Sequence, residues 1–232
     1  MYGKMQINRI SGDPLYQFVW DFVDANMYVL VHGKNALVID PNDSMDGQLF
    51  LKQNNISCVT VLLTHEHFDH ISGTNWLKDN FDCTVITNCK CAEHIKLPQK
   101  NLSDKTEVLR AFNAALSSRE DLCTINPFSC NADITFQKTY DIGWFGHSVH
   151  IIETPGHTPG SVCIILDKKI IFSGDTLLKE YKTITRLPGG DKKLFKNYTL
   201  PLLKKYETDE VIVYPGHGEP GDISDMICLN QN

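Results

Sequence analysis

The sequence predicts an α/β fold in which helices cover both outer faces of a β-sandwich. In the first half of the chain, short apolar runs alternate with helical segments, which is typical of layered α/β proteins. In the second half, strand signals return in quick succession, and a helical segment precedes the last of them. Each half can therefore form one sheet with a layer of helices on its outer face.

The first half begins with a predicted hairpin. Residues 27–32 and 36–40 are β-rich runs separated by Gly33-Lys34-Asn35, and the second run ends in the turn Asp40-Pro41. A polar helical stretch and a short β-branched run follow, and the latter predicts a buried strand. The segments expected in order are a helix at 44–54, a strand at 58–63, a helix at 71–80, a strand at 84–87 and a helix at 89–95.

The pattern weakens between residues 97 and 131, where we predict an insertion or lid with a helical piece at 105–116. The segments expected after it are strands at 134–138, 149–153, 162–166 and 169–172, a helix at 192–206 and a strand at 211–214. We interpret residues 1–232 as a single domain, because single hydrophobic cores stop growing only at roughly 250–300 residues.

Composition and charge favour a small-molecule substrate. The formal net charge of -6 at pH 7 counts against nucleic acid or an anionic membrane as the main partner. The chain has no apolar run of membrane-spanning length, and its first residues lack a signal-peptide pattern. A cytoplasmic location with the eight cysteines as reduced thiols is therefore expected. The sequence leaves the oligomeric state open.

The segment His65-x-His67-x-Asp69-His70 places four candidate metal ligands directly after the predicted strand at 58–63. Side chains alternate along an extended segment, so His65 and His67 are expected to point the same way and to share one ion. Asp69 and His70 lie where the next helix begins and face elsewhere, which makes a second ion plausible. A polar loop of merely hydrogen-bonded histidines is the alternative, and it suits one histidine better than this packed set.

Three further candidates each follow an apolar strand: His157 in Pro155-Gly156-His157, Asp175 in Ser173-Gly174-Asp175, and His217 in Pro215-Gly216-His217. Each of them alone is also typical of an ordinary turn. Together they can complete a set of ligands for two metal ions, since strand ends in a layered fold can converge on one edge. Four other histidines receive no predicted role and are expected to be satisfied by their neighbours: His32, His94, His147 and His150.

These motifs, in this order, resemble the metallo-β-lactamase superfamily, and within it the glyoxalase II-like (hydroxyacylglutathione hydrolase-like) enzymes. The resemblance implies a four-layered αβ/βα sandwich with the site at one edge. It also implies that one ion is held by three histidines, a second ion by three other residues, and that an aspartate bridges the two. The implied sets are His65, His67 and His157; Asp69, His70 and His217; and the bridging Asp175.

The activity implied is hydrolysis, most closely of a thioester such as a hydroxyacyl thiol conjugate. Histidine and carboxylate ligands suit two zinc ions per chain, and they also suit iron or manganese. A water shared by two such cations should have its pKa lowered towards ~7, giving hydroxide at neutral pH. Asp69 is the expected catalytic residue, as an orienter of that water. Alternatives are a lactone or other ester hydrolase, a mononuclear iron persulfide dioxygenase, and a metal-binding module without turnover.

The chain departs from the family pattern where substrate contacts are expected. Ile184 and Arg186 stand where compact relatives carry arginine and aspartate, and residues 219–232 are too few for the extra helical domain of full-length glyoxalase II enzymes. We therefore expect the loop at 176–190 and the insertion at 97–131 to select the substrate. The cationic and aromatic candidates for substrate binding in that loop are Lys179, Tyr181 and Arg186.

Overall fold

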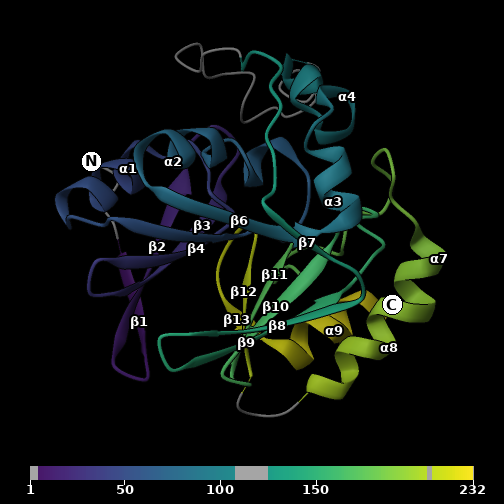
Figure 1. The fold of residues 1–232 in the computed structure, drawn as a ribbon. Helices are drawn as coiled ribbons and strands as arrows, with labels where there is room; N and C mark the ends of the chain where they lie inside the picture. Colours follow the sequence, from purple (N-terminus) through teal and green to yellow (C-terminus); the bar gives the residue numbers. More distant parts are fainter. Residues whose placement is uncertain (1–4, 108–124, 208–210, 232) are drawn as a thin grey trace.

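A computed structural model describes residues 5–107, 125–207 and 211–231. Two β-sheets pack face to face, and each carries helices on its outer face (Figure 1). The predicted four-layered αβ/βα sandwich is therefore confirmed.

The first sheet has seven strands in sequence order. They are β1 (Met5–Ile10), β2 (Asp13–Trp20), β3 (Ala25–His32), β4 (Asn35–Ile39), β5 (Cys58–Leu62), β6 (Asp82–Asn88) and β7 (Ile134–Phe136). The strands from β1 to β4 pair antiparallel, and β3 with β4 forms the predicted hairpin. From β4 onwards the neighbours are parallel, because helical segments connect β4 to β5 and β5 to β6.

The second sheet has the order β13-β12-β11-β10-β9-β8. Its strands are β8 (Thr139–Trp144), β9 (His147–Glu153), β10 (Val162–Leu166), β11 (Ile170–Gly174), β12 (Ile212–Pro215) and β13 (Gly221–Asp222). Among the strands of this sheet that the structure describes, β11 and β12 pair parallel, and helical segments between residues 192 and 206 lie between them in the chain. The other pairs are antiparallel.

Helical segments accompany both sheets. With the first sheet belong α1 (Met45–Gln53), η1 (Phe68–His70), α2 (Thr74–Asn80), α3 (Cys89–His94), α4 (Pro98–Asn101) and η2 (Ser103–Lys105). With the second belong α7 (Lys192–Leu194), η3 (Phe195–Thr199), α8 (Leu200–Leu203), η4 (Lys204–Tyr206) and α9 (Ile223–Gln231). The predicted helix at 192–206 is present, but η3 is a π-helical turn. Pro201 explains this irregularity, because it has no N–H to donate to the preceding turn.

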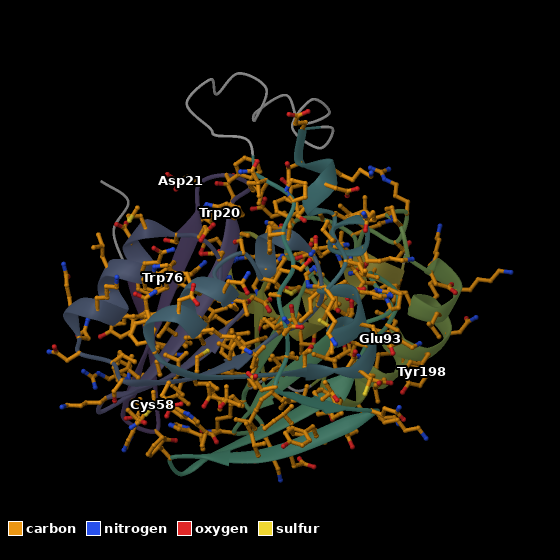
Figure 2. The ribbon with its side chains drawn as sticks, turned by 45° about the horizontal axis from the view of Figure 1, so that its top comes forward. Trp20, Asp21, Cys58, Trp76, Glu93 and Tyr198 are labelled. Carbon is orange, nitrogen blue, oxygen red and sulfur yellow. The ribbon has the colours of Figure 1, made fainter. Side chains whose placement is uncertain are left out.

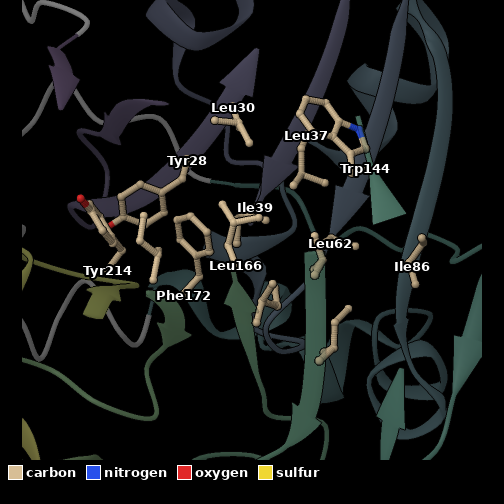
Figure 3. Packing of buried hydrophobic residues seen from close by; sticks show 14 of the residues in the cluster. Tyr28, Leu30, Leu37, Ile39, Leu62, Ile86, Trp144, Leu166, Phe172 and Tyr214 are labelled. Carbon is tan, nitrogen blue, oxygen red and sulfur yellow. The ribbon is translucent and has the colours of Figure 1, made fainter. Parts of the chain in front are cut away.

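Alternation along the strands divides the core into layers. In β3, Tyr28 and Leu30 enter the cluster between the two sheets, whereas Met27 and Val29 enter the cluster beneath the helices. Figure 3 shows the inter-sheet layer, where Tyr28 packs against Phe172 with ring centroids 5.2 Å apart. A third cluster packs α8 and α9 onto the outer face of the second sheet. These layers hold the strand ends in fixed relative positions.

Several elements were not predicted from the sequence, among them β1, β2, β8, β13, α4, η2 and α9. Strands β1 and β8 are sheet edges, and the burial pattern of β8 alternates until Trp144, so neither shows a continuous apolar run. Helix α9 did carry a signal, because Ile223, Met226 and Ile227 recur at helical spacing and are buried.

The predicted insertion at 97–131 begins with α4 and η2 and returns at residue 125. Its helical piece expected at 105–116 lies, from residue 108 onwards, outside the described residues. In the described part of the chain, no helix is both long and apolar enough to cross a membrane.

Candidate metal centre

All seven predicted ligands lie together at one edge of the sandwich, although their positions in the chain span more than 150 residues. The segment 65–70 follows β5, and His157 follows β9. Asp175 follows β11 and His217 follows β12. Strand ends of both sheets thus supply the side chains, as the pattern of motifs predicted.

The first group consists of His65, His67 and His157, whose nitrogens all lie within 4.8 Å of one another. His67 Nδ1 lies 3.1 Å from His157 Nε2. All three side chains are buried. His65 and His67 share one side of the loop, as alternation predicted, and their ring centroids are 4.8 Å apart.

The second group consists of Asp69, His70 and His217, also within 4.8 Å of one another. Asp69 Oδ2 lies 3.3 Å from His217 Nε2 and 3.6 Å from His70 Nε2. The side chain of His70 is fully buried, but that of His217 is 25% exposed and that of Asp69 is 12% exposed. The centre therefore opens to solvent on the side of the second group.

Asp175 lies between the two groups. Its Oδ2 is 3.6 Å from His157 Nε2 of the first group and 3.6 Å from His217 Nε2 of the second, and its Oδ1 is 3.5 Å from His70 Nε2. Gly216 permits this close approach, because a Cβ there would lie 2.6 Å from Cε1 of His70 and would also collide with Asp175. The glycine before His217 is thus required by packing.

Several buried atoms of this cluster have no hydrogen-bond partner. They are Nε2 of His65, His67 and His70, and Oδ1 of Asp175. Leaving a buried polar atom unpaired costs about 1–3 kcal/mol, so four in one place indicate a ligand that completes them. Nitrogen and carboxylate donors without thiolate fit zinc, iron or manganese.

Four of the candidate ligand histidines have a hydrogen-bond partner at Nδ1. His70 Nδ1 lies 3.1 Å from Asp40 Oδ2, and His65 Nδ1 lies 3.0 Å from Thr64 Oγ1. Backbone carbonyls accept from the remaining two: Ile184 O from His157 Nδ1 at 2.7 Å, and Asp24 O from His217 Nδ1 at 3.2 Å. A ring that donates through Nδ1 presents Nε2 as a metal ligand, and such partners fix its orientation.

Asp40 has a larger role than the turn predicted for it. The residue is buried, with φ of +53°, and its carboxylate accepts from the backbone N–H of Thr64 at 2.7 Å and from Thr64 Oγ1 at 2.5 Å. It therefore supports His65 through Thr64 and His70 directly.

Burial and charge set the protonation of the cluster. Burial, followed by the charge of His157, lowers the pKa of His67 to about 4, and burial also lowers the pKa of His65 well below its usual value. These imidazoles are neutral at pH 7, which is the form that binds metal. Burial acts in the same direction on His70, but Asp69, Asp175 and Asp40 outweigh it and raise its pKa to about 10. An ion held by His70 must therefore displace a proton.

The four histidines without a predicted role each contact a carboxylate. Among them His94 of α3 is linked to the centre, because its Nδ1 lies 2.8 Å from Glu66 Oε1. The other oxygen of Glu66 accepts from Thr158 Oγ1 at 2.8 Å. Glu66 thus ties the 65–70 loop to the loop that carries His157.

The three candidate substrate residues Lys179, Tyr181 and Arg186 are exposed, and Tyr181 is 65% exposed. Their loop reaches the centre through the backbone of Ile184, which holds His157. The insertion reaches it through Leu102, which packs with Phe22 and Phe68 behind the 65–70 loop. Trp20, labelled in Figure 2, joins this cluster with its ring centroid 6.3 Å from that of Phe68.

The chain belongs to the metallo-β-lactamase superfamily, whose family model matches residues 20–217. A probable metallo-hydrolase of Methanocaldococcus jannaschii is 30% identical over 204 residues, covering 85% of this chain and 89% of that protein. A hydroxyacylglutathione hydrolase of Prochlorococcus marinus is 32% identical over 168 residues, covering 69% of this chain and 50% of that protein. The crystal structure of the B3 metallo-β-lactamase BLEG-1 is similar with a TM-score of 0.73 and 28% identity, covering 93% of this chain and 97% of that one.

Proposed function

We propose that this protein is a hydrolase that uses two zinc ions to cleave a small thioester. His65, His67 and His157 would hold one ion, and Asp69, His70 and His217 the other. The observation that supports this most directly is the position of Asp175, with one oxygen 3.6 Å from a histidine of each group. A carboxylate placed in this way can serve both ions at once.

Two divalent cations at these positions would lower the pKa of a shared water towards ~7 and polarise the attacked carbonyl. Asp69 lies on the open side of the centre, where it can orient a water molecule and take up a proton. Burial raises the pKa of Asp69, but His70 and His217 outweigh it and hold that pKa below its usual value. Its carboxylate is therefore ionised at neutral pH and accepts hydrogen bonds.

Two similarities support a thioester as the substrate. The motifs resemble those of glyoxalase II-like enzymes, and the chain is similar to the hydroxyacylglutathione hydrolase of Prochlorococcus marinus, of which it covers half the length. The exposed loop at 176–190 supplies Lys179, Tyr181 and Arg186 as groups for an acidic or flat acyl portion. Arginine is suited to this task, because its guanidinium can bind a carboxylate with two hydrogen bonds.

Metal analysis followed by a substrate panel tests this proposal. After reconstitution with zinc, iron or manganese, we expect two ions per chain and thioester hydrolysis that chelation abolishes. If only lactones are hydrolysed, the protein is a lactone hydrolase and not a thioester hydrolase. If the chain binds one iron ion and oxidises persulfides, it is a persulfide dioxygenase and not a hydrolase. Bound metal without turnover of thioesters, lactones or phosphoesters would indicate a binding module, and no bound metal would overturn the proposal.

Arg186→Ala tests the substrate loop separately. It should raise KM for acidic thioesters roughly tenfold, the worth of one charge-assisted hydrogen bond, and change KM for neutral thioesters little. Lys169→Ala, which removes an exposed cation from the turn between β10 and β11, is the control for net charge. Equal effects on both substrate types would remove Arg186 from the binding site.

A further inference from the structure

The side chain of His217 is the most exposed of the seven candidate metal ligands. The loop that carries it belongs to the second sheet but forms hydrogen bonds with the first sheet. Residues at the start of β3 contact this loop through their backbone. The N–H of Asn26 donates to Gly216 O at 2.7 Å, and Asp24 O accepts from His217 Nδ1 at 3.2 Å. The orientation of His217 therefore depends on how this loop sits against β3.

The side chain of Asn26 adds a second set of contacts on both sides of His217. It is 1% exposed, and its Nδ2 lies 3.0 Å from Pro215 O and 2.9 Å from Gly218 O. Backbone carbonyls only accept, so the amide nitrogen must face them. Its Oδ1 accordingly accepts from Gln17 Nε2 at 2.7 Å, which fixes the amide in this orientation.

Tyr28 reinforces one of these two contacts. Its hydroxyl donates to Pro215 O at 2.7 Å, the same carbonyl that Asn26 contacts. Burial raises the pKa of Tyr28 well above its usual value, so the hydroxyl keeps its proton and remains a donor. Pro215 O thus has two donors, whereas among the side-chain hydrogen bonds of the described residues Gly218 O has Asn26 alone.

We propose that Asn26 is the positioning residue of the second ion: by donating to the carbonyls of Pro215 and Gly218, it holds His217 where it can act as a ligand. The inference rests on the proposed two-metal function. His157 of the first group is oriented independently, by Ile184 O. Loss of the Asn26 amide should therefore affect the second ion and spare the first.

The isosteric substitution Asn26→Asp tests this role. It keeps the shape of the side chain but places one carboxylate oxygen against two carbonyl oxygens, so that two attractive contacts become repulsive. We expect affinity for the second zinc ion to fall about 10–100-fold, as for loss of other groups that orient ligands, and affinity for the first to stay unchanged. Stepwise zinc titration against a chromophoric chelator resolves the two affinities, and the Co²⁺ spectrum reports the geometry of each ion.

Asn101→Asp is the matched control. Asn101 is also fully buried, and its Nδ2 donates to two backbone carbonyls, Ile95 O at 3.2 Å and Phe128 O at 2.9 Å, neither of which belongs to a segment that carries a candidate ligand. Its substitution creates the same carboxylate-to-carbonyl repulsion, so it should lower the free energy of unfolding while both zinc affinities stay at wild-type values. Tyr28→Phe, which leaves the Asn26 amide in place, should weaken the second ion less than Asn26→Asp does.

The outcomes separate this inference from the proposed function. Fewer than two ions in the wild-type protein would overturn both. If the wild type binds two ions and Asn26→Asp lowers both zinc affinities equally, or lowers neither, the positioning role alone is overturned. Asn26→Ser, which removes both donors without introducing charge, decides the question by the same titration if Asn26→Asp does not fold.

Discussion

The two ends of the β-sandwich both gather histidines and aspartates, but they differ in what those side chains contact. Strands β3 and β9 run between the two ends, with Ala25 and Glu153 near the candidate metal centre and His32 and His147 at the opposite end. At the opposite end, His147 Nδ1 lies 2.7 Å from Asp167 Oδ2 and His147 Nε2 lies 3.2 Å from Asp13 Oδ2.

At that opposite end each ring nitrogen of His147 contacts a carboxylate, Nδ1 that of Asp167 and Nε2 that of Asp13. Asp13 also faces His32 Nδ1 at 2.9 Å, and because Asp13 belongs to β2 and His147 to β9, the cluster joins the two sheets. At the candidate metal centre, by contrast, no hydrogen bond reaches the buried Nε2 of His65, His67 or His70, and the carboxylates nearest to His70 Nε2 lie 3.5 and 3.6 Å away. Unpaired nitrogens, rather than the number of histidines, therefore distinguish a metal centre from an ion-pair cluster.

The largest difference is expected between Asp175→Ala and Asp167→Ala. Asp175→Ala removes the carboxylate that lies between both ligand groups, so metal content should fall and turnover should be abolished. Asp167→Ala removes one of the two carboxylates that contact His147 at the other end and should leave metal content at the wild-type value. Elemental analysis of both purified variants makes this comparison; normal metal content and rate in Asp175→Ala would contradict the bridging role.

A smaller effect is expected from the carboxylates that support histidines. Asp40→Asn keeps the size of the side chain but weakens the anchoring of His70 and Thr64, so metal affinity should fall about 10–100-fold. Asp13→Asn makes the same change beside His147 and His32 and should leave metal affinity unchanged. Competition with a chelator measures both; equal affinities in the two variants would show that the ends do not differ in this way.

His147→Gln should act on stability alone. It leaves Asp13 and Asp167 without their shared imidazole and should lower the free energy of unfolding by about 1–3 kcal/mol, the cost of losing hydrogen bonds to charged groups. Urea denaturation measures this change, and metal content provides the control. A loss of bound metal in His147→Gln would mean that the two ends are coupled.

The smallest effect is expected from His150→Ala. His150 Nδ1 lies 2.6 Å from Asp141 Oδ1, but the side chain of Asp141 is 74% exposed, so solvent screens the pair. The free energy of unfolding should change by less than about 1 kcal/mol, as for other surface ion pairs. A change as large as that of His147→Gln, in the same denaturation experiment, would show that burial does not decide the strength of these pairs.

Most of the fold could be predicted from local patterns. The hairpin of β3 and β4, the buried strand β5 and the helical stretch at 192–206 each carry their signal within a few neighbouring residues. The missed strands β1 and β8 lie at sheet edges, where one-sided burial leaves no continuous apolar run. Helix α9 could have been predicted, because the helical spacing of its apolar residues is visible in the sequence.

The candidate ligands could be named from the sequence because each directly follows a strand and their types suit a divalent ion. That His157, Asp175 and His217 come close together was an inference from the motifs, and only the packing of two sheets gives the distances between them. The supporting residues Asp40, Glu66 and Asn26 could not be distinguished beforehand. An aspartate after a strand or an asparagine before one is typical of turns, whereas the contacts that support the site include Asp40 with Thr64, 24 positions away, and Asn26 with Gly218, 192 positions away.

The sequence by itself determined the identity and order of the donors and the strands that present them, because these depend on residue type and on short-range periodicity. The tertiary structure decided which nitrogens have partners and which do not. Partners such as Asp40 for His70, or Ile184 O for His157, come from separate strands and loops, so they exist only once both sheets have packed. This is why His70 and His147 are the same residue type but differ in the fold: no hydrogen bond reaches Nε2 of His70, whose nearest carboxylates there lie 3.5 and 3.6 Å away, whereas His147 has a carboxylate within hydrogen-bond distance of each ring nitrogen.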